Sequence, residues 1–381
     1  MNMEQLNLKQ RNAGFLAFFL SGICAISSGV IVSLLQEQIG FDYGTTGSLL
    51  SMMNIGNLIA GFATGVLTGR IGMKRTVIIL TVGYLAGYGI MAVSGWVALL
   101  MLAFFLVGMA KGCTLNTCTI LVGDNSENRT KGMNLMHSCY AMGALLCPFV
   151  ISAAALLSGK IPMAVLALLG TLLWLTFLGV PMEGGRRAGS RGSDWSFLKS
   201  RKFWLLTGLV FCQNAAETSV TGWMVTYFKG SGILTGVLSA YTVTVMWGAT
   251  LIARLLIAFV FPLKKPEAAM IRMGIGCTIF YVVMMQATNQ WMAVLLLFAF
   301  AASMAGMNPT AVACAGRMTS VTSMGVMLPV ASSGAILMPW ITGMVANQAG
   351  LRAGMACNIV PCVGMLLFSM AVKRFSDAEN R

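Results

Sequence analysis

The chain has 381 residues, of which 57% are apolar and only 9% are charged, and its formal net charge is +14. Soluble globular domains carry about 25% charged residues, so a chain this apolar needs lipid around it. The positive charge does not indicate nucleic-acid binding, because membrane proteins collect Lys and Arg on their cytoplasmic loops. Composition therefore excludes an ordinary soluble enzyme and predicts a membrane protein that crosses the bilayer several times.

Twelve apolar runs are long enough to cross a membrane. A spanning segment needs roughly 20 mostly apolar residues, and it must be helical because lipid leaves backbone polar groups no other partners. The runs lie at 13–35, 45–67, 75–94, 97–123, 132–157, 162–180, 203–228, 235–262, 269–287, 291–314, 320–346 and 352–372. The first run follows Lys9 and Arg11 and lacks a small-residue cleavage site, so we expect no cleaved signal peptide.

The loops between these runs differ strongly in charge. If both termini are cytoplasmic, twenty Lys and Arg residues fall on cytoplasmic segments, and only Lys160, Lys229 and Arg352 fall outside. Positive residues accumulate on the cytoplasmic side of membrane proteins. The sequence therefore predicts a multi-pass protein of the cytoplasmic membrane with both termini inside the cell.

The chain reads as two related halves. The longest polar stretch, rich in Gly, Arg and Ser, predicts a flexible cytoplasmic linker over 181–202, between bundles at 1–180 and 203–381. The segment GALLCP at Gly143–Pro148 recurs as GAILMP at Gly334–Pro339, 191 residues later and in the matching helix of the second half. Parallel repeats of six helices are typical of transporters that work by alternating access.

The loop after the second run, GVLTGRIGMKR at Gly65–Arg75, resembles the signature of the major facilitator superfamily, with Gly69 where the signature has an acidic residue. The resemblance implies an all-α membrane fold of twelve helices in two six-helix bundles that are related by pseudosymmetry. It also implies a cytoplasmic gate that includes Arg70, Lys74 and Arg75.

A narrower resemblance rests on helix five, MNLMHSCYAMGALLCP at 133–148, together with the spaced glycines of helix four, Glu217 of helix seven and Arg254 of helix eight. These segments are similar to the fucose/glucose/galactose porter branch, whose members import sugars with protons or sodium. The acidic residues of proton-coupled members in helices one and four are absent here, and helix four carries Lys111 instead.

Two ionisable residues lie deep within apolar runs. Such residues cost roughly 2.5–3.5 kcal/mol to insert, so they are functional candidates by default. Glu217 lies about 21 Å along its helix, with Gln213 one turn before it and Thr221 one turn after it. Lys111 is equally deep, and the resemblance implies that its helix lines the central cavity. We expect Lys111 to pair with Glu217 in one transport state, to bind an anionic substrate group, or to form a permanent structural contact.

Each remaining candidate residue allows a functional and a structural interpretation. Arg254 is expected at a gate or a helix end, and His137 is either a proton relay or a packing residue. Polar and aromatic side chains could shape a pocket for a hydroxyl-rich ligand, or could join helices through hydrogen bonds and packing. These are Asn57, Asn116, Gln213, Asn214, Asn308 and Trp223. Pro309 frees a backbone carbonyl next to Asn308.

Neither a phosphate-binding loop nor a catalytic set is present in the sequence, so we expect no enzyme, no ATP, no metal and no cofactor. The predicted function is secondary active transport of a small polar solute, with a sugar favoured, protons as the coupling ion and a monomeric protein. Alternatives are proton-antiport efflux of amphipathic compounds, uptake of an organic anion or a nucleoside, and a non-transporting sensor built on the same fold.

Overall fold

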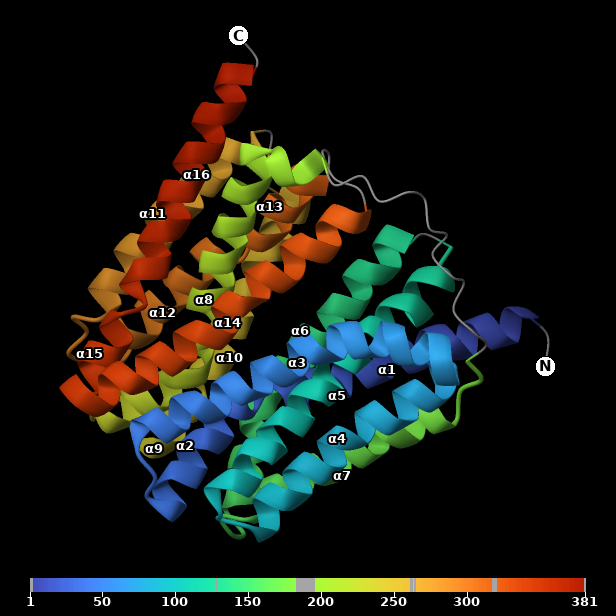
Figure 1. Cartoon of the computed structure of the whole chain (residues 1–381). Coiled ribbons are helices and arrows are strands. Elements are labelled where there is room, and N and C mark those ends of the chain that lie inside the picture. Colours follow the sequence, from blue (N-terminus) through green and yellow to red (C-terminus); the bar gives the residue numbers. More distant parts are fainter. Residues whose placement is uncertain are drawn as a thin grey trace. The chain divides into compact units, whose positions relative to one another are not determined.

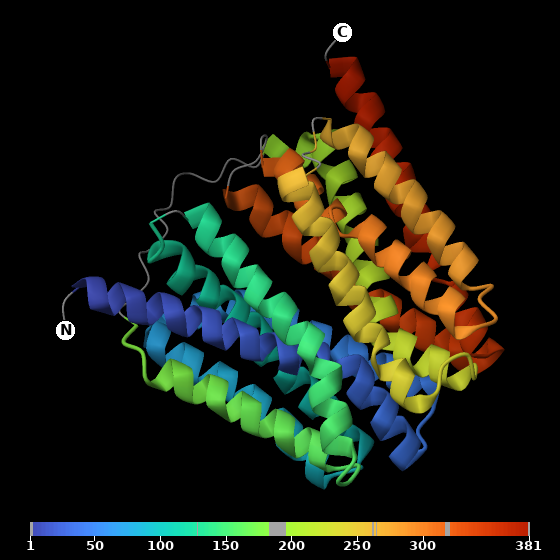
Figure 2. The ribbon, with the colours of Figure 1, turned by 180° about the vertical axis from the view of Figure 1, so that it is seen from behind.

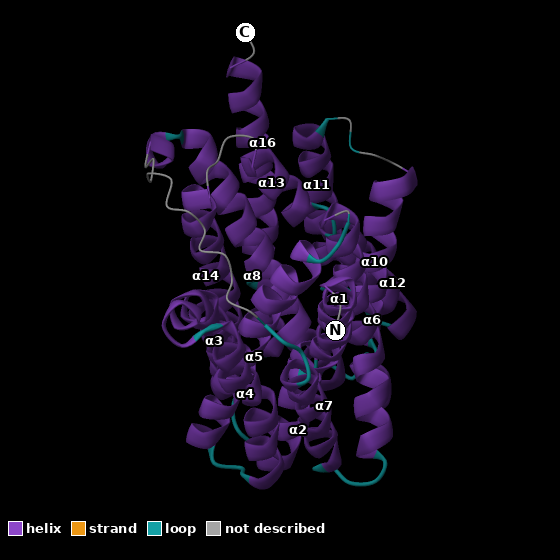
Figure 3. Ribbon diagram, turned by 90° about the vertical axis from the view of Figure 1, so that its right-hand side faces the viewer, coloured by secondary structure: helices purple, strands orange, loops and turns teal. Residues whose placement is uncertain are grey.

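The computed structural model describes residues 3–127, 129–182, 196–260, 263, 265–316 and 321–379. The chain divides into two compact units, Met1–Ala188 and Gly189–Arg381 (Figure 1). The described residues of both units form helices joined by short loops, without strands (Figure 3). Most of the predicted linker, residues 183–195, lies outside the described part of the chain.

The first unit contains six membrane-length segments. They are α1 and α2 (Met3–Ile26 and Ser28–Ile39), α3 (Tyr43–Ile71), α4 (Met73–Val93), α5 (Val97–Asp124), α6 (Arg129–Ala155) and α7 (Ile161–Leu178). The first predicted run is one span interrupted at Ser27, whose hydroxyl lies 2.8 Å from the Cys24 carbonyl and 2.7 Å from the Tyr88 hydroxyl of α4. A polar side chain that competes for a helical carbonyl bends the helix at that point.

The second unit contains six more segments, several of them broken. It comprises a 3-10 turn η1 (Ser196–Lys199), α8 (Arg201–Gly230), α9 (Gly236–Ala240), α10 (Thr242–Leu255), a π-helical turn η2 (Leu256–Val260), α11 (Pro266–Met284), α12 (Gln290–Met304), α13 (Met307–Gly316), α14 (Val321–Ala349), α15 (Leu351–Ala356) and α16 (Ile359–Glu379). Every predicted run thus coincides with a helical segment, and four runs consist of two or more elements.

Eleven of the segments in the described ranges are long and apolar enough to cross a membrane. The remaining predicted span is the seventh, which forms α8; this helix is 30 residues long, but polar side chains at Gln213, Asn214 and Glu217 interrupt its apolar sequence near the middle. At about 1.5 Å per residue it is long enough to cross the bilayer. The least apolar helix of the second unit is therefore the one that carries most of the predicted site.

Glycines bring the helices of each unit into backbone contact. In the first unit α3 packs on α5. There α1 also packs on α6, seen as the dark blue and green-teal ribbons of Figure 2. A Cβ atom at Gly143 of α6 would lie 2.1 Å from the Phe19 carbonyl oxygen of α1. In the second unit, a Cβ atom at Gly334 of α14 would lie 2.3 Å from the Phe211 carbonyl oxygen of α8. The repeated sequence segments thus make the same helix contact in both units, as small residues at membrane helix interfaces allow.

The signature loop forms the turn between α3 and α4. Gly72 has a φ of +85°, a backbone conformation that residues with a Cβ rarely adopt, and it ends one helix and begins the next. Gly69 has open space around the position that a side chain would occupy. The loss of the usual acidic residue there therefore removes a charge without changing the turn.

Candidate functional site

The second unit joins four of the predicted site residues by hydrogen bonds. Asn308 of α13 donates from Nδ2 to Gln213 Oε1 at 2.8 Å and to Asn214 Oδ1 at 3.3 Å, and Gln213 Nε2 donates to Glu217 Oε2. Gln213 is only 2% exposed, whereas Glu217 and Asn308 are half-buried. Gln213 accepts from Asn308 at its oxygen and donates from its nitrogen to Glu217, so this chain of bonds ends at the carboxylate, which is the strongest acceptor.

A break in the tenth predicted span positions Asn308. The span stops at Met304, turns at Ala305 and Gly306, and resumes at Met307. Pro309 has no N–H, so the Ala305 carbonyl four residues earlier lacks its helical partner. Arg254 Nε of α10 fills that place and donates to the Ala305 oxygen at 3.1 Å. Arg254 thus makes a helix-end contact, which holds the turn that precedes Asn308.

We expect Arg254 and Pro309 to show energetic coupling. Arg254→Met leaves the Ala305 carbonyl without its charged donor and should lower stability by about 1.5–3 kcal/mol. Pro309→Ala restores a backbone N–H that can reach this carbonyl, so the Arg254→Met change should cost about 1 kcal/mol less in that background. Thermal unfolding of the four purified proteins measures the coupling. Additive effects in the double variant would contradict this account.

The gate candidates of the first unit differ in their surroundings. Arg70 and Arg75 are exposed. The Lys74 ammonium donates to the carbonyl oxygens of Phe177, Leu178 and Val180 at 2.7, 2.6 and 2.5 Å. These carbonyls end α7, where the helix dipole favours a cation. Lys74 therefore fastens the start of α4 to the end of α7 within its own unit.

The polar residues of the first unit gather where α3 meets α5. Lys111 and Asn116 are both half-buried on α5. Asn57 of α3 lies against Gly112, where a Cβ atom would be 3.2 Å from Asn57 Oδ1. That oxygen is buried and has no hydrogen-bond partner among the described residues. An unsatisfied acceptor beside the turn that carries Lys111 can receive a hydrogen bond from a ligand or water.

Three residues that the sequence singled out make contacts outside this hydrogen-bonded set. Trp223 is fully buried, and its Nε1 donates to the Pro339 carbonyl of α14 at 3.1 Å. His137 is exposed, and the edge of its ring meets Phe18 with the centroids 5.6 Å apart. Thr221 does not join the Glu217 bonds, because its hydroxyl donates to Met246 Sδ at 3.4 Å.

Buried hydroxyls that the sequence analysis did not single out tie helices together in both units. Ser21 of α1 bonds Tyr84 of α4 at 2.8 Å, one turn from the Ser27–Tyr88 pair. In the second unit Ser219 of α8 bonds Thr342 of α14 at 2.9 Å. One feature of the sequence indicates these contacts. The two tyrosines are four residues apart, which places both hydroxyls on one face of α4.

The geometry of each unit is compatible with a solute site that is built from amides and single charges. No group of three or more His, Cys, Asp or Glu side chains in the described ranges could hold a metal ion. The predicted pairing of Lys111 with Glu217 joins residues of different units and stays a prediction.

Comparisons with known proteins agree with this architecture. The chain matches the model of a family described as Major Facilitator Superfamily over residues 14–339. A protein named TsgA homolog from Erwinia tasmaniensis is 20% identical over 353 residues, which cover 90% of this chain and 89% of the relative.

Solved transporter structures share the fold at low sequence identity. A mutant of the nucleoside transporter NupG superposes with a TM-score of 0.80 at 13% identity, covering 97% of this chain and 99% of that one. A D-xylose-proton symporter superposes with a TM-score of 0.76 at 14% identity, covering 96% and 97% of the two chains. These similarities concern the fold.

Proposed function

The chain belongs to the major facilitator superfamily of membrane transporters, and we propose that it imports a small polar solute, with a sugar as the leading class, together with protons. The proposed mechanism is alternating access, in which the two bundles expose a site near the bilayer midplane to each side in turn. The observation that carries the proposal is the hydrogen-bonded set Asn308–Gln213–Glu217, with Asn214 beside it, formed between α8 and α13.

The chemistry of this set suits a hydroxyl-rich ligand. An amide both donates and accepts, so Asn308, Gln213 and Asn214 can exchange their mutual bonds for bonds to sugar hydroxyls without leaving polar atoms unpaired. An amphipathic compound carries fewer hydroxyl and amide groups, so it could replace fewer of these mutual bonds. This argument favours a sugar or nucleoside over an amphipathic compound.

Glu217 is the proposed proton carrier. Its carboxylate accepts from Gln213 Nε2, a bond that is stronger while the carboxylate is charged. Protonation weakens that bond, frees Gln213 Nε2 to bond a solute hydroxyl while Gln213 Oε1 keeps its bond from Asn308, and removes a charge that is costly to hold inside the bilayer. Solute binding and proton binding would thus act on the same three side chains, which is what coupling requires.

We propose that Lys111 and Asn57 of the first unit also contribute to solute binding. Lys111 would supply a fixed positive charge, and the unsatisfied Asn57 oxygen would accept from a ligand hydroxyl. The named structural neighbours, a nucleoside transporter and a D-xylose-proton symporter, are consistent with sugar-like cargo.

The charge asymmetry of the loops favours both termini in the cytoplasm and a location in the cytoplasmic membrane. We propose a monomer as the working unit.

The test uses the purified protein in liposomes that contain a trapped pH dye. Sugars, nucleosides, carboxylates and cationic dyes are added one at a time to the outside. Under this proposal a sugar moves protons inward, so the lumen acidifies, and liposomes without protein do not respond. Proton release from the lumen on addition of a cationic dye would indicate antiport efflux instead. Solute exchange without any proton movement would remove proton coupling from the proposal.

A further inference from the structure

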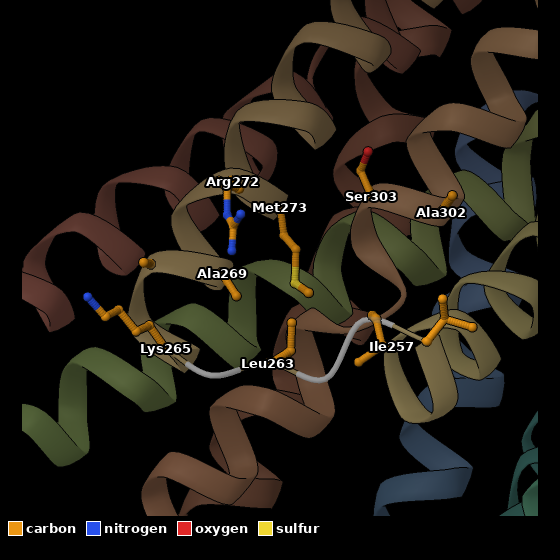
Figure 4. A pocket seen from close by; sticks show the side chains of 10 residues that line it. Ile257, Leu263, Lys265, Ala269, Arg272, Met273, Ala302 and Ser303 are labelled. Atoms are coloured by element: carbon orange, nitrogen blue, oxygen red, sulfur yellow. The ribbon is translucent and has the colours of Figure 1, made fainter.

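A recess lies in the second unit, beside the break between α12 and α13. It has a volume of about 1120 Å³ and is lined by residues of η2, by Leu263 and Lys265, by the first turns of α11 and by the end of α12. Met273 projects from α11 toward Leu263, Arg272 projects from the same face of α11, and Lys265 and Ser303 lie at the edges of the recess (Figure 4). We call this recess the η2 groove. Its volume exceeds the usual range for a small-molecule pocket of about 300–1,000 Å³.

The lining of the η2 groove combines two kinds of chemistry. Its charged residues are Lys265 and Arg272, both exposed cations, and no carboxylate is among its lining residues. Its walls include Ile257, Val260 and Met273, and the apolar surface continues past Val260 to Phe259, which is 81% exposed. The matching ligand has an anionic group at one end and an apolar chain at the other. A sugar lacks both features, and free phosphate lacks the chain.

The η2 groove lies at the end of the unit where a bilayer would supply such a ligand. It adjoins the start of α11, at the same end of the unit as the start of α8 and the end of α16, which carry Arg201, Lys202, Lys373 and Arg374 (Figure 1). Clustered Lys and Arg mark the cytoplasmic face, where anionic lipids are concentrated. We propose that the η2 groove binds an anionic phospholipid, with its phosphate at Lys265 and Arg272 and an acyl chain along Val260.

The floor of the groove adjoins the break that positions Asn308. A Cβ atom at Gly306 would lie 2.5 Å from Met273 Cε and 2.8 Å from Ile257 Cδ1, so both wall residues rest on that glycine. Gly306 is two residues from Asn308, and the neighbouring Ala305 carbonyl is held by Arg254. A lipid chain that fixes Met273 and Ile257 therefore also fixes the turn that presents Asn308 to Gln213.

The test measures lipid retained by the purified full-length protein, using native mass spectrometry with phosphatidylglycerol and phosphatidylcholine of identical acyl chains. We expect the wild type to retain phosphatidylglycerol selectively. Lys265→Gln combined with Arg272→Gln should weaken retention by roughly 25-fold, about fivefold for each cation. Lys373→Gln combined with Arg374→Gln removes the same charge at the same end but outside the groove, and it should change retention by less than about twofold. Ala302→Phe fills the groove without changing charge and should also release the lipid.

Three outcomes would overturn the proposal. Equal losses in the two double variants would mean that the lipid responds to surface charge in general. Equal retention of phosphatidylcholine would mean that the cations do not select the headgroup. Displacement of the lipid by millimolar inorganic phosphate would mean a phosphate site without a role for the apolar walls. Unchanged thermal unfolding of the variants, whose altered cations are exposed, establishes that binding rather than folding was changed.

Discussion

Replacing Glu217 with Gln is expected to abolish proton-driven accumulation of the solute while leaving solute exchange intact. Gln is nearly the same size as Glu, and its side-chain oxygen can still accept from Gln213 Nε2. The bonds that hold Asn308 and Asn214 therefore survive. What is lost is the only group of this network that can take up and release a proton.

The size of the effect follows from the driving force. When one proton accompanies each solute, a difference of one pH unit across the membrane can drive about tenfold accumulation. Without a proton carrier the internal and external concentrations become equal, so the accumulation ratio falls from about ten to about one. The experiment compares solute accumulation under an imposed pH gradient with exchange of labelled solute without a gradient, in the same liposomes.

A matched control comes from the same unit. Glu267 lies in the first turn of α11, outside the hydrogen-bonded set, so Glu267→Gln removes a carboxylate of the same kind at another place. We expect it to accumulate solute like the wild type. If Glu217→Gln keeps both its accumulation and its dependence on pH, Glu217 is not the proton carrier. If exchange is lost together with accumulation, the residue belongs to solute binding rather than to coupling.

The membrane segments were predictable from sequence because a bilayer leaves the helix as almost the only backbone conformation for an apolar run of this length. A run at 97–123 had to be a helix, and the structure has α5 at Val97–Asp124. The breaks inside the spans were harder to predict because they depend on distant partners. Ser27 interrupts the first span where Tyr88 of α4 meets it, and the turn at Ala305 is held by Arg254 of α10. Nothing in the local sequence identifies either partner.

The same distinction applies to the site. The bond between Gln213 and Glu217 follows from helical spacing, since residues four apart share a face. That spacing also suggested Thr221, but Met246 competes for its hydroxyl from another helix. Asn308 could be named as a candidate site residue because Pro309 follows it. Its contacts with two amides of α8 could not be predicted, because they join residues about 95 positions apart in the sequence.

The contact between α3 and α5 leads to a prediction about stability. Gly108→Ala should lower the free energy of unfolding by about 3 kcal/mol, at the upper end of the usual cost of overpacking. The added Cβ would lie 1.9 Å from the Met53 carbonyl oxygen and 2.8 Å from its carbon, so backbone rather than a flexible side chain must move. Thermal unfolding in detergent and the elution profile of the purified protein measure the loss.

Gly61→Ala of α3 is the matched control. It adds the same methyl group to one of the same two helices, but no atom lies within 4 Å of the new Cβ. Because Ala favours a helix over Gly by about 0.8–1.0 kcal/mol, this variant should be as stable as the wild type or more so. Equal stability of the two variants would show that α3 and α5 are not in backbone contact at Gly108.

The prediction for Gly108 extends from stability to the polar residues on either side of it. The same Cβ would lie 3.0 Å from the Asn57 backbone nitrogen, so the helix shift that relieves the clash must move Asn57 relative to Lys111. If these two residues contribute to solute binding, the fraction of Gly108→Ala protein that remains folded should bind the solute more weakly. Gly61→Ala should bind it normally. A folded Gly108→Ala protein with normal affinity would separate the α3–α5 contact from the site and leave solute binding to the second unit.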